Sequence, residues 1–546
     1  NPNDPKRKDL EGRKVNNPLT DEEMEIITDE FVDPEFGTGI VKLTPAHDTN
    51  DYEVAKKHDL PIRSAFELNG TVRNIPEAGN FAGLPVAEAR EKIVAYLQGK
   101  DLIEKIDQAY EHSVAVCYKA GHDIEPTILP NWFVKVDEDG NSLKQPAHVA
   151  VKNGDVTIYP KWQETKYHRW MEIMHDWPIS RQTVWGIRIP VWYDVSNHLE
   201  RVTVSFLAKS KRQVTGTLHQ LTKENEYTLE EIREGLLQIQ VPIFEAEEDN
   251  PPYQISINMP TEDGMWLPET DTFDTWFSSG HWPLTTLGYP DSDDFKRFYP
   301  TNVLETGWEI LRFWVSRMVM FGLYLTDKVP FHDVYLHGLV RAIDGRKMSK
   351  SLGNIINPEQ YQEEYGTDAL RIGLISGTAT GKDFNFPHDK IVGYKKFITK
   401  IWNMARFIVI LKENSKFEIL NSKFNPDDLD LNDQDRKILD TLDQTIQKVD
   451  TELAKYRFDD AAEALYHFVW EDIASSYLED VKNREDQSVG LPVLIHVFVE
   501  SLKLLHPFMP FVTEKIYQSL REENIVSNEA TDILMVAQWP KVRNNK

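Results

Sequence analysis

The segment richest in chemistry is residues 344–354, DGRKMSKSLGN, in which two lysines stand between two glycines. It follows a strand-like run at residues 334–340, so Lys347 and Lys350 are predicted to lie on a loop at the end of a strand. Such a loop can close over a polyphosphate and place two ammonium groups where charge builds up on phosphoryl oxygens. The alternative interpretation is a solvated basic turn.

A second polar segment, residues 36–61, reads FGTGIVKLTPAHDTNDYEVAKKHDLP. It places Lys42, Thr44, Asp48 and Asp51 close together in the chain, and its glycines and proline permit a close backbone approach and a turn. We expect these four side chains to converge on one polar pocket. The alternative is an ordinary strand followed by a turn stabilised by Asp and Asn side chains.

The regions that must position these residues differ in pattern along the chain. Residues 1–165 alternate β-like runs with short helical stretches, which predicts an α+β region. Residues 166–384 alternate strand-like and helical runs, including a helix over 308–325, which predicts α/β layers. Within them, residues 196–265 are charged, lack motifs and are interpreted as an insertion. The β-like runs of the first region are EFGTGIVKLT at 35–44, HSVAVCYK at 112–119 and NWFVKVD at 131–137.

Residues 385–546 change to long amphipathic helices. Their apolar residues recur at three- and four-residue spacing, which is typical of a helical bundle. Two stripes carry this pattern: Ile438, Leu442, Ile446, Val449 and Leu453, and then Leu465, Phe468, Ile473 and Tyr477.

Composition and charge narrow the class of protein. The 546 residues are enough for roughly three or four domains, and 40 % hydrophobic and 11 % aromatic residues suffice for sizeable cores. No apolar run reaches the ~18 residues of a membrane span, and no apolar signal core is present. A single cysteine, Cys117, excludes a disulfide framework and a Cys-rich zinc site. The net charge of −27 weighs against a protein that simply coats nucleic acid, and leaves an enzyme with local basic patches.

Residues 347–351, KMSKS, match letter for letter the second signature of the class I aminoacyl-tRNA synthetases. Further stretches resemble the valine branch of that family over the whole chain. They are WPISRQTVWGIRIPVW at 177–192, DTFDTWFSSGHWP at 271–283, ETGWEILRFWVSRM at 305–318, WNMARF at 402–407, YLEDVK at 477–482 and HPFMPFVTEKIY at 506–517. The first signature of the family, His-x-Gly-His, is not found, so we expect an N-terminally truncated chain.

The resemblance implies a fold that is α/β and α+β multidomain. It comprises a partial β-rich editing domain over 1–165, the second half of a Rossmann-type catalytic domain over 166–384, and a C-terminal α-helical anticodon-binding bundle over 385–546. Lys347 and Lys350 are the implied catalytic residues. The implied ATP-binding residues are Lys347, Met348, Ser349, Lys350, Ser351, His337 and Gly338.

The family holds valine in a small apolar pocket, and the matching positions here are Trp276, Ile310 and Trp314. Ile310 and Trp314 are four residues apart and would share one helix face. Two indoles would leave little room for isoleucine, and Glu309 is a candidate partner for the substrate ammonium group. From the spacing alone, ordinary core aromatics are the more frequent explanation.

The polar segment at 36–61 has the family's Lys-x-Thr-Pro-Ala-His-Asp order and implies an editing pocket that removes threonine from tRNA(Val). An apolar pocket rejects an added hydroxyl only weakly, so a second, polar pocket is needed. Its implied residues are Lys42, Thr44, Asp48 and Asp51. The implied tRNA-binding residues, which contact phosphates, are Lys395, Lys396, Lys400 and Arg406.

The resemblance also implies the partners, which are valine, tRNA(Val) and ATP with Mg²⁺ as a substrate. We expect no zinc, no membrane association, a monomer and a cytoplasmic location. Three functions stay open: a ligase that needs the missing N-terminal segment, a non-catalytic tRNA-binding paralogue, and a trans-editing deacylase. Retention of both the lysine loop and the valine pocket favours the ligase.

Overall fold

The structure is a computed structural model of the chain. It describes residues 1–546 except 67–69, 74–79, 108, 110, 112, 118–120, 139, 184, 224–225, 242–249, 415–423, 427–428, 527–530 and 544–546, and of Ser351 and Asn414 it describes the backbone alone. Two compact units make up the chain. One is Asn1–Asn131 with Val191–Pro268, and the other is Trp132–Pro190 with Glu269–Lys546.

The first boundary between the units falls after residue 131, whereas the sequence places one near residue 165. The difference has a structural cause. β4 (Thr157–Tyr159) pairs in parallel with β15 (Phe331–His337), and α3 (Lys144–Asn153) packs against a helix of the same unit. Residues that precede the expected boundary therefore contribute a strand and a helix to the second unit.

Residues 1–131 contain little regular structure. Their described elements are a short 3-10 turn (Lys8–Leu10), the antiparallel pair β1 (Lys14–Asn16) and β2 (Glu23–Glu25), α1 (Thr49–Lys57) and α2 (Val86–Gly99). The strand expected at 35–44 is wrong, because this stretch forms turns and leaves Phe36 and Ile40 70 % and 54 % exposed. A strand needs a neighbour for its backbone hydrogen bonds. This stretch has none, and the described part of residues 1–131 is not β-rich.

The other two expected runs have different outcomes. In the run at 112–119, residues 112, 118 and 119 lie outside the described residues, and the remainder forms one isolated bridge from Val116 to Asp123. The run at 131–137 contains β3 (Phe133–Val134), which pairs with β5 (Trp177–Pro178). That strand is confirmed.

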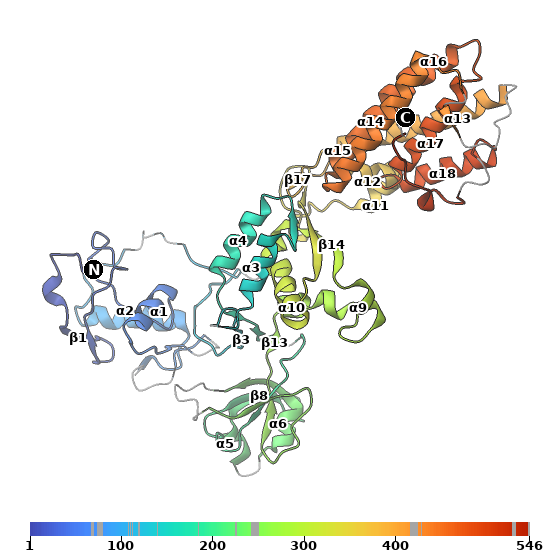
Figure 1. The fold of residues 1–546 in the computed structure, drawn as a ribbon. Coiled ribbons are helices and arrows are strands. Elements are labelled where there is room, and N and C mark those ends of the chain that lie inside the picture. The colour runs from blue at the N-terminus through green and yellow to red at the C-terminus, as the bar shows by residue number, and fades with distance from the viewer. Residues whose placement is uncertain are drawn as a thin grey trace. The chain divides into compact units, whose positions relative to one another are not determined.

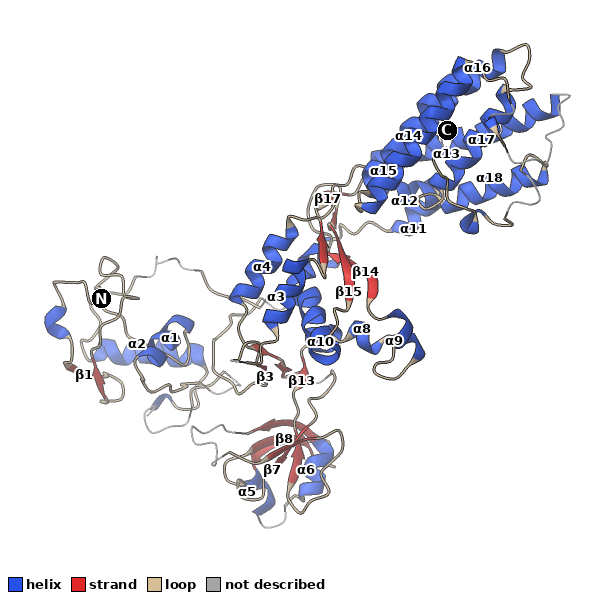
Figure 2. Cartoon of the chain, in the orientation of Figure 1, coloured by secondary structure: helices blue, strands red, loops and turns tan. Residues whose placement is uncertain are grey.

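Residues 191–268 form a small β structure with its own buried side chains. One antiparallel sheet has the order β10-β8-β9 and the other has the order β11-β7-β12, both drawn in red in Figure 2. The elements are β7 (Val191–Asp194), β8 (Thr203–Leu207), β9 (Gln213–Thr217), α5 (Leu218–Thr222), α6 (Leu229–Gly235), β10 (Leu236–Gln240), β11 (Tyr253–Ile255) and β12 (Trp266–Pro268). Phe206, Leu218 and Ile232 are fully buried, so the motif-poor insertion is a folded segment.

A parallel sheet of order β14-β15-β4 is the centre of the α/β region (Figure 1). Its strands alternate with helices, as the pattern at 166–384 predicts, and Val334, Leu336 and Ile158 are buried in its core. The helices are α3, α4 (Gln163–Ile173) and α10 (Ser316–Thr326), beside β14 (Thr301–Gly307). Short elements are β6 (Ser180–Arg181), β13 (Thr272–Phe273), α7 (Thr275–Gly280), α8 (Trp282–Thr285) and α9 (Asp293–Phe298).

The single helix expected at 308–325 is wrong in detail. A 3-10 turn (Trp308–Ile310) and a π-helical turn (Leu311–Val315) precede α10. Ser316 Oγ and Arg317 Nη1 donate to the carbonyls of Arg312 and Phe313, so side chains occupy carbonyls of this turn. π-helical turns are frequent at functional sites, and this one carries Trp314, one of the predicted pocket residues.

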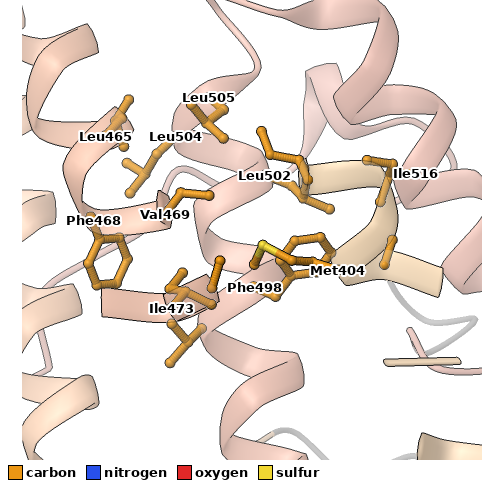
Figure 3. Packing of buried hydrophobic residues seen from close by; sticks show 14 of the residues in the cluster. Met404, Leu465, Phe468, Val469, Ile473, Phe498, Leu502, Leu504, Leu505 and Ile516 are labelled. Atoms are coloured by element: carbon orange, nitrogen blue, oxygen red, sulfur yellow. The ribbon is translucent and has the colours of Figure 1, made fainter. Parts of the chain in front are cut away.

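The C-terminal helices pack into a bundle with one large apolar core (Figure 1). Met404, Phe468, Phe498, Leu502 and Ile516 meet in it from four different helical segments (Figure 3). The predicted stripes are confirmed as buried except for Leu453, which is half-buried. The helices are α11 (Pro358–Tyr365), α12 (Thr367–Ile375), α13 (His388–Asn414), α14 (Asp433–Ala454), α15 (Phe458–His467), a π-helical segment (Phe468–Tyr477), α16 (Leu478–Asn483), α17 (Gly490–Leu505) and α18 (Pro510–Glu522).

Two negative findings apply to the part of the chain that the structure describes. None of its helices is both long and apolar enough to cross a membrane. No three His, Cys, Asp or Glu side chains in it gather in a way that could hold a metal ion.

Candidate active site

The carboxyl ends of β14 and β15 border a cavity of about 270 Å³. The two strands run parallel and pair Glu305 with Tyr335 and Gly307 with His337, so they end at the same edge of the sheet. The loop at 378–382 lines the cavity opposite them. Ligands of open α/β sheets bind beyond the carboxyl ends of parallel strands, so this edge is the candidate active site.

His337 and Gly338, two of the predicted ATP-binding residues, line this cavity. His337 Nδ1 contacts the Glu305 carboxylate. A Cβ on Gly338 would stand 1.7 Å from the carbonyl oxygen of Lys382, which no side chain permits. The backbone of Gly338 therefore packs directly against the backbone of the loop at 378–382.

The lysine loop begins directly after β16 (Val340–Arg341), which pairs in parallel with β17 (Phe384–Asn385). Hydrogen bonds within the loop hold its shape: Asn354 Oδ1 accepts from the Ser349 amide at 2.9 Å, and Asn354 Nδ2 donates to the Lys347 carbonyl at 3.1 Å. The two positions of positive φ, at the glycines of residues 345 and 353, close its turns. The loop therefore connects β16 to α11 through a turn at Gly345 and a 3-10 turn at Lys350–Leu352.

Both lysines of the loop point away from protein partners. The side chains of Lys347 and Lys350 are exposed, and within the described residues neither ammonium group has a hydrogen-bond or ion-pair partner. Met348 is half-buried and its sulfur accepts from the Ile356 amide at 3.5 Å, which anchors the loop between the lysines. The side chain of Ser351 lies outside the described residues.

α7 brings together the two tryptophans predicted for the valine pocket. Trp276 lies in α7, and Trp314 Nε1 donates to the Ser279 carbonyl of the same helix at 2.9 Å. Trp276 stacks on Phe313 at 5.8 Å between ring centroids, and Trp282 meets Trp314 edge-on at 6.0 Å. These contacts place both indoles around the π-helical turn.

Glu309 and Ile310 lie on the 3-10 turn that follows β14. Ile310 also precedes the π-helical turn, so it and Trp314 do not share one regular α-helix. Glu309 Oε2 is buried and has no hydrogen-bond partner among the described residues. A buried unpaired carboxylate oxygen costs free energy, and an ammonium group would satisfy it.

Three of the four predicted editing residues meet at the start of α1. Asp48 caps the helix by accepting from the amides of Asn50 and Asp51 at 2.8 and 3.1 Å. Asp51 is buried and accepts from the amide and hydroxyl of Thr44 at 2.6 and 3.0 Å. Lys42 is exposed and is not brought into this cluster by a hydrogen bond or ion pair within the described residues.

His47, which lies between these residues, has both ring nitrogens engaged. Its Nε2 accepts from the Ala65 amide at 2.8 Å, so the hydrogen lies on Nδ1, which donates to the Pro126 carbonyl at 2.8 Å. A ring held in this way stabilises the local fold and has no free nitrogen to act as a base.

The four predicted tRNA-binding residues lie along α13 and have different surroundings. Lys395 Nζ donates to the Glu364 carbonyl at 2.6 Å. Lys400 Nζ donates to Ser475 Oγ at 3.2 Å and lies 4.2 Å from the Trp470 ring centroid. Lys396 and Arg406 are exposed, with no hydrogen-bond or ion-pair partner in the described part of the chain.

Sequence reasoning misses Asp383, which lies between the candidate pocket and the lysine loop. Its carboxylate accepts from the Trp308 indole, the Leu339 amide and the Arg341 guanidinium. Burial pushes the pKa of Asp383 upward, but these donors outweigh it and hold the pKa below its ordinary value. No local pattern marks this residue, because its partners are 42 to 75 positions away in the chain.

Comparison with known proteins gives two family matches. Residues 13–387 match the family described as tRNA synthetases class I (I, L, M and V). Residues 435–546 match the anticodon-binding domain of tRNA ligase. The first match covers the α/β region and the second covers most of the helical bundle.

Individual relatives point the same way. The chain is 39 % identical to the valine–tRNA ligase of Staphylococcus haemolyticus and 37 % identical to that of Staphylococcus aureus (strain Mu3), in each case over 100 % of this chain and 55 % of the relative. It therefore spans about half the length of these curated relatives. The methionyl-tRNA synthetase of Mycobacterium tuberculosis, bound by methionyl-adenylate, shares its fold with a TM-score of 0.51 at 18 % identity, over 79 % of this chain and 70 % of that chain.

Proposed function

The chain belongs to the class I tRNA synthetases of the isoleucine, leucine, methionine and valine group, and from this premise we propose that it is part of a valine–tRNA ligase. The ligase activates valine with ATP and transfers it to tRNA(Val). The observation that carries the proposal is the shared edge of the sheet. The turn with Glu309 follows the carboxyl end of β14, and its parallel neighbour β15 leads through the short strand β16 into the lysine loop.

In this proposal the lysine loop binds ATP, supplied with Mg²⁺ as a substrate. A carboxylate oxygen of valine bonds to the α-phosphorus, the bond to the bridging oxygen breaks, and pyrophosphate leaves. Lys347 and Lys350 stabilise the charge on the phosphoryl oxygens, and the exposure of both ammonium groups supports this role. His337 and Gly338 border the nucleotide, and Met348, Ser349 and Ser351 complete the loop.

Valine itself is assigned to the pocket at α7 and the turn after β14. Trp276, Ile310 and Trp314 surround its side chain, and the two indoles exclude isoleucine by steric overlap. Glu309 accepts the α-ammonium group. The buried, unpaired Oε2 of Glu309 supports this assignment, since a charge-assisted hydrogen bond would satisfy it.

The remaining assignments concern tRNA. The helical bundle binds the anticodon arm, with phosphates contacted by Lys396 and Arg406 and, less strongly, by Lys395 and Lys400. Thr44, Asp48, Asp51 and Lys42 belong to an editing pocket that hydrolyses threonyl-tRNA(Val) in the complete protein. We also propose that the protein is monomeric and acts in the cytoplasm.

Valine-dependent exchange of pyrophosphate into ATP tests the proposal. We expect exchange from the product of the complete reading frame and none from residues 1–546 alone, because the His-x-Gly-His segment is needed for the nucleotide. In the complete protein, Lys347→Ala and Lys350→Ala should each reduce the rate by about 10²–10³, the usual loss for a preorganised group that stabilises a transition state. Exchange by residues 1–546 at the full rate would contradict the proposal, as would a complete protein without valine-dependent exchange.

A further inference from the structure

We propose that Asp383 is a positioning residue that couples the turn of the valine pocket to the root of the lysine loop. The proposal rests on the proposed function for what these two segments bind. It rests on the structure for the coupling itself. One carboxylate reaches both segments: Oδ1 accepts from Trp308 and Leu339, and Oδ2 accepts from Arg341.

Oδ1 of Asp383 contacts the turn assigned to valine, which begins at Trp308. It accepts from Trp308 Nε1 at 2.8 Å, and Trp308 opens the turn that carries Glu309. Lys166 Nζ lies 4.7 Å from the centroid of the Trp308 ring, so the indole is held on its face as well as at its nitrogen. The position of the turn relative to the sheet therefore depends on this hydrogen bond.

The loop side is held by both oxygens. Oδ1 accepts from the Leu339 amide at 2.9 Å, and Oδ2 accepts from Arg341 Nε and Nη2 at 3.1 and 2.5 Å. Arg341 is the last residue of β16, directly before the lysine loop, and Asp383 directly precedes β17, the partner of β16. Two N–H groups of one guanidinium on one carboxylate fix direction as well as distance.

Asp383 has little freedom to follow a displaced partner. Its side chain is 16 % exposed. The close packing of Gly338 against the carbonyl of Lys382 restricts the backbone directly before Asp383. The low pKa of Asp383 means that its carboxylate is ionised near neutral pH, when all three donors are engaged. Loss of one acceptor position therefore releases a specific segment and leaves its donor unpaired.

The coupling matters because the two substrates are held on different strands. Valine is assigned to the turn after β14 and the triphosphate to the loop after β16, so attack on the α-phosphorus requires the two segments to stay aligned. A misplacement of about 1 Å can reduce the rate by about 10². Asp383 connects both segments through one carboxylate.

Two substitutions of Asp383 separate the two sides. Asn keeps Oδ1 as an acceptor for Trp308 and Leu339 but presents an amide to Arg341, so Asp383→Asn releases the lysine loop alone. Ala releases both sides. In the complete protein we expect Asp383→Asn to lower kcat for valine-dependent exchange about tenfold with KM for valine unchanged, a loss confined to the transition state. Asp383→Ala should lower kcat as much and also raise KM for valine about tenfold.

Two single changes reproduce the separate effects. Arg341→Met should resemble Asp383→Asn, and it should add nothing further in the double variant, because both remove one interaction. Trp308→Phe removes the indole donor and should raise KM for valine without the loss in kcat. Asp435→Asn, which alters a carboxylate of similar partners within the helical bundle, serves as the matched control. It should lower stability and leave kcat per folded molecule unchanged.

Hydrogen exchange on residues 1–546 gives a readout that does not depend on activity. Asp383→Asn should speed exchange in 342–354 and leave 308–315 unchanged, and Asp383→Ala should speed both. If the wild-type complete protein shows no exchange of pyrophosphate into ATP, the proposed function fails. The pattern of hydrogen exchange in the variants still tests the coupling. If the wild type is active and both Asp383 variants keep wild-type kcat and KM, the coupling is refuted. The same holds if Asp383→Asn speeds hydrogen exchange equally in both segments.

Discussion

The α/β region and the helical bundle each contain a carboxylate that accepts from an arginine, an aromatic donor and a backbone amide. In the α/β region Asp383 is 16 % exposed and its arginine, Arg341, is 39 % exposed. In the bundle Asp435 is 1 % exposed and Arg484 is 14 % exposed. Asp435 accepts from Arg484 Nη2 at 2.7 Å, from the Tyr477 hydroxyl at 2.5 Å and from the amide of its own helix cap at residue 432.

The difference lies in what each carboxylate joins. Asp435 joins helical segments that share one apolar core. Burial pushes the pKa of Asp435 upward and its three donors outweigh that effect, so the ionised form is part of the fold. Asp383 joins the turn at Trp308–Ile310 and the start of the lysine loop, two segments that are assigned to different substrates, and its side chain is partly exposed. We infer that similar bonding serves stability in the bundle and alignment in the α/β region.

The strongest test of this contrast is Asp435→Ala. It removes the buried carboxylate, leaving the Arg484 guanidinium with Asp480 alone and the buried Tyr477 hydroxyl with the Gly490 carbonyl at 3.4 Å, so it should lower the free energy of unfolding of the bundle by about 3–5 kcal/mol. Chemical denaturation followed by circular dichroism measures the effect. Asp383→Ala in the same assay should cost less, because water reaches Arg341. Equal losses in the two variants would remove the contrast.

The bundle should also lose stability in acid through His496. Burial, with added repulsion from Lys503 and Arg543, lowers the pKa of His496 to about 4, and its ring stacks on Phe424 at 4.1 Å between centroids. In the unfolded chain His496 binds a proton near pH 6.5, whereas in the folded chain it does so only near pH 4. The free energy of unfolding therefore falls as the pH is lowered from about 6.5 to about 4. The loss should reach about 3 kcal/mol.

Denaturation of wild type and His496→Gln at pH 7 and pH 4.5 isolates this effect, because the other titrating groups are common to both proteins. The variant should lose less stability between the two pH values. A pH dependence that the substitution does not change would show that His496 has no part in it.

In the α/β region the matching prediction concerns binding rather than stability. Glu309→Gln removes the charge assigned to the substrate ammonium group, which is worth about 1.5–3 kcal/mol, or roughly 10- to 100-fold in KM for valine. Valine-dependent exchange by the complete protein measures KM, and denaturation should show no loss of stability. An unchanged KM would remove Glu309 from the pocket.

The smallest expected effects are those of the α13 surface. Lys396→Ala and Arg406→Ala should each reduce the slope of log affinity for tRNA(Val) against log salt by about 1, the contribution of one phosphate contact. Lys395→Ala should change it less, since its ammonium group is bonded to the Glu364 carbonyl. Filter binding over a range of salt concentrations measures the slopes. Equal slopes for all three variants would reject this ranking.

The features that the sequence predicts well depend on local pattern. The stripe through Ile438, Leu442 and Ile446 predicts the buried face of α14, and the run at 334–340 predicts β15 and β16 ahead of the lysine loop. Helical periodicity and strand composition act over a few residues, and the folded chain retains them.

The features that it misses depend on partners far along the chain. Residues 35–44 have strand composition and find no neighbour, so they form turns. Asp383 has no motif, and its bonds to Trp308 and Arg341 appear once the sheet has brought distant segments to one edge. The regular helix expected after Gly307 is wrong in detail, because apolar spacing does not distinguish the 3-10 turn Trp308–Ile310 and the π-helical turn Leu311–Val315 from an α-helix.

That π-helical turn has a consequence for how the pocket can change by mutation. It holds one residue more than an α-helical turn, so deleting one residue among 311–315 would restore α geometry and leave α10 in its core. Everything upstream would rotate by about 100° relative to α10, the angle of one helical residue. A single codon loss would thereby swing the acidic and aliphatic side chains of the preceding turn away from the indoles, and a compensating insertion would swing them back.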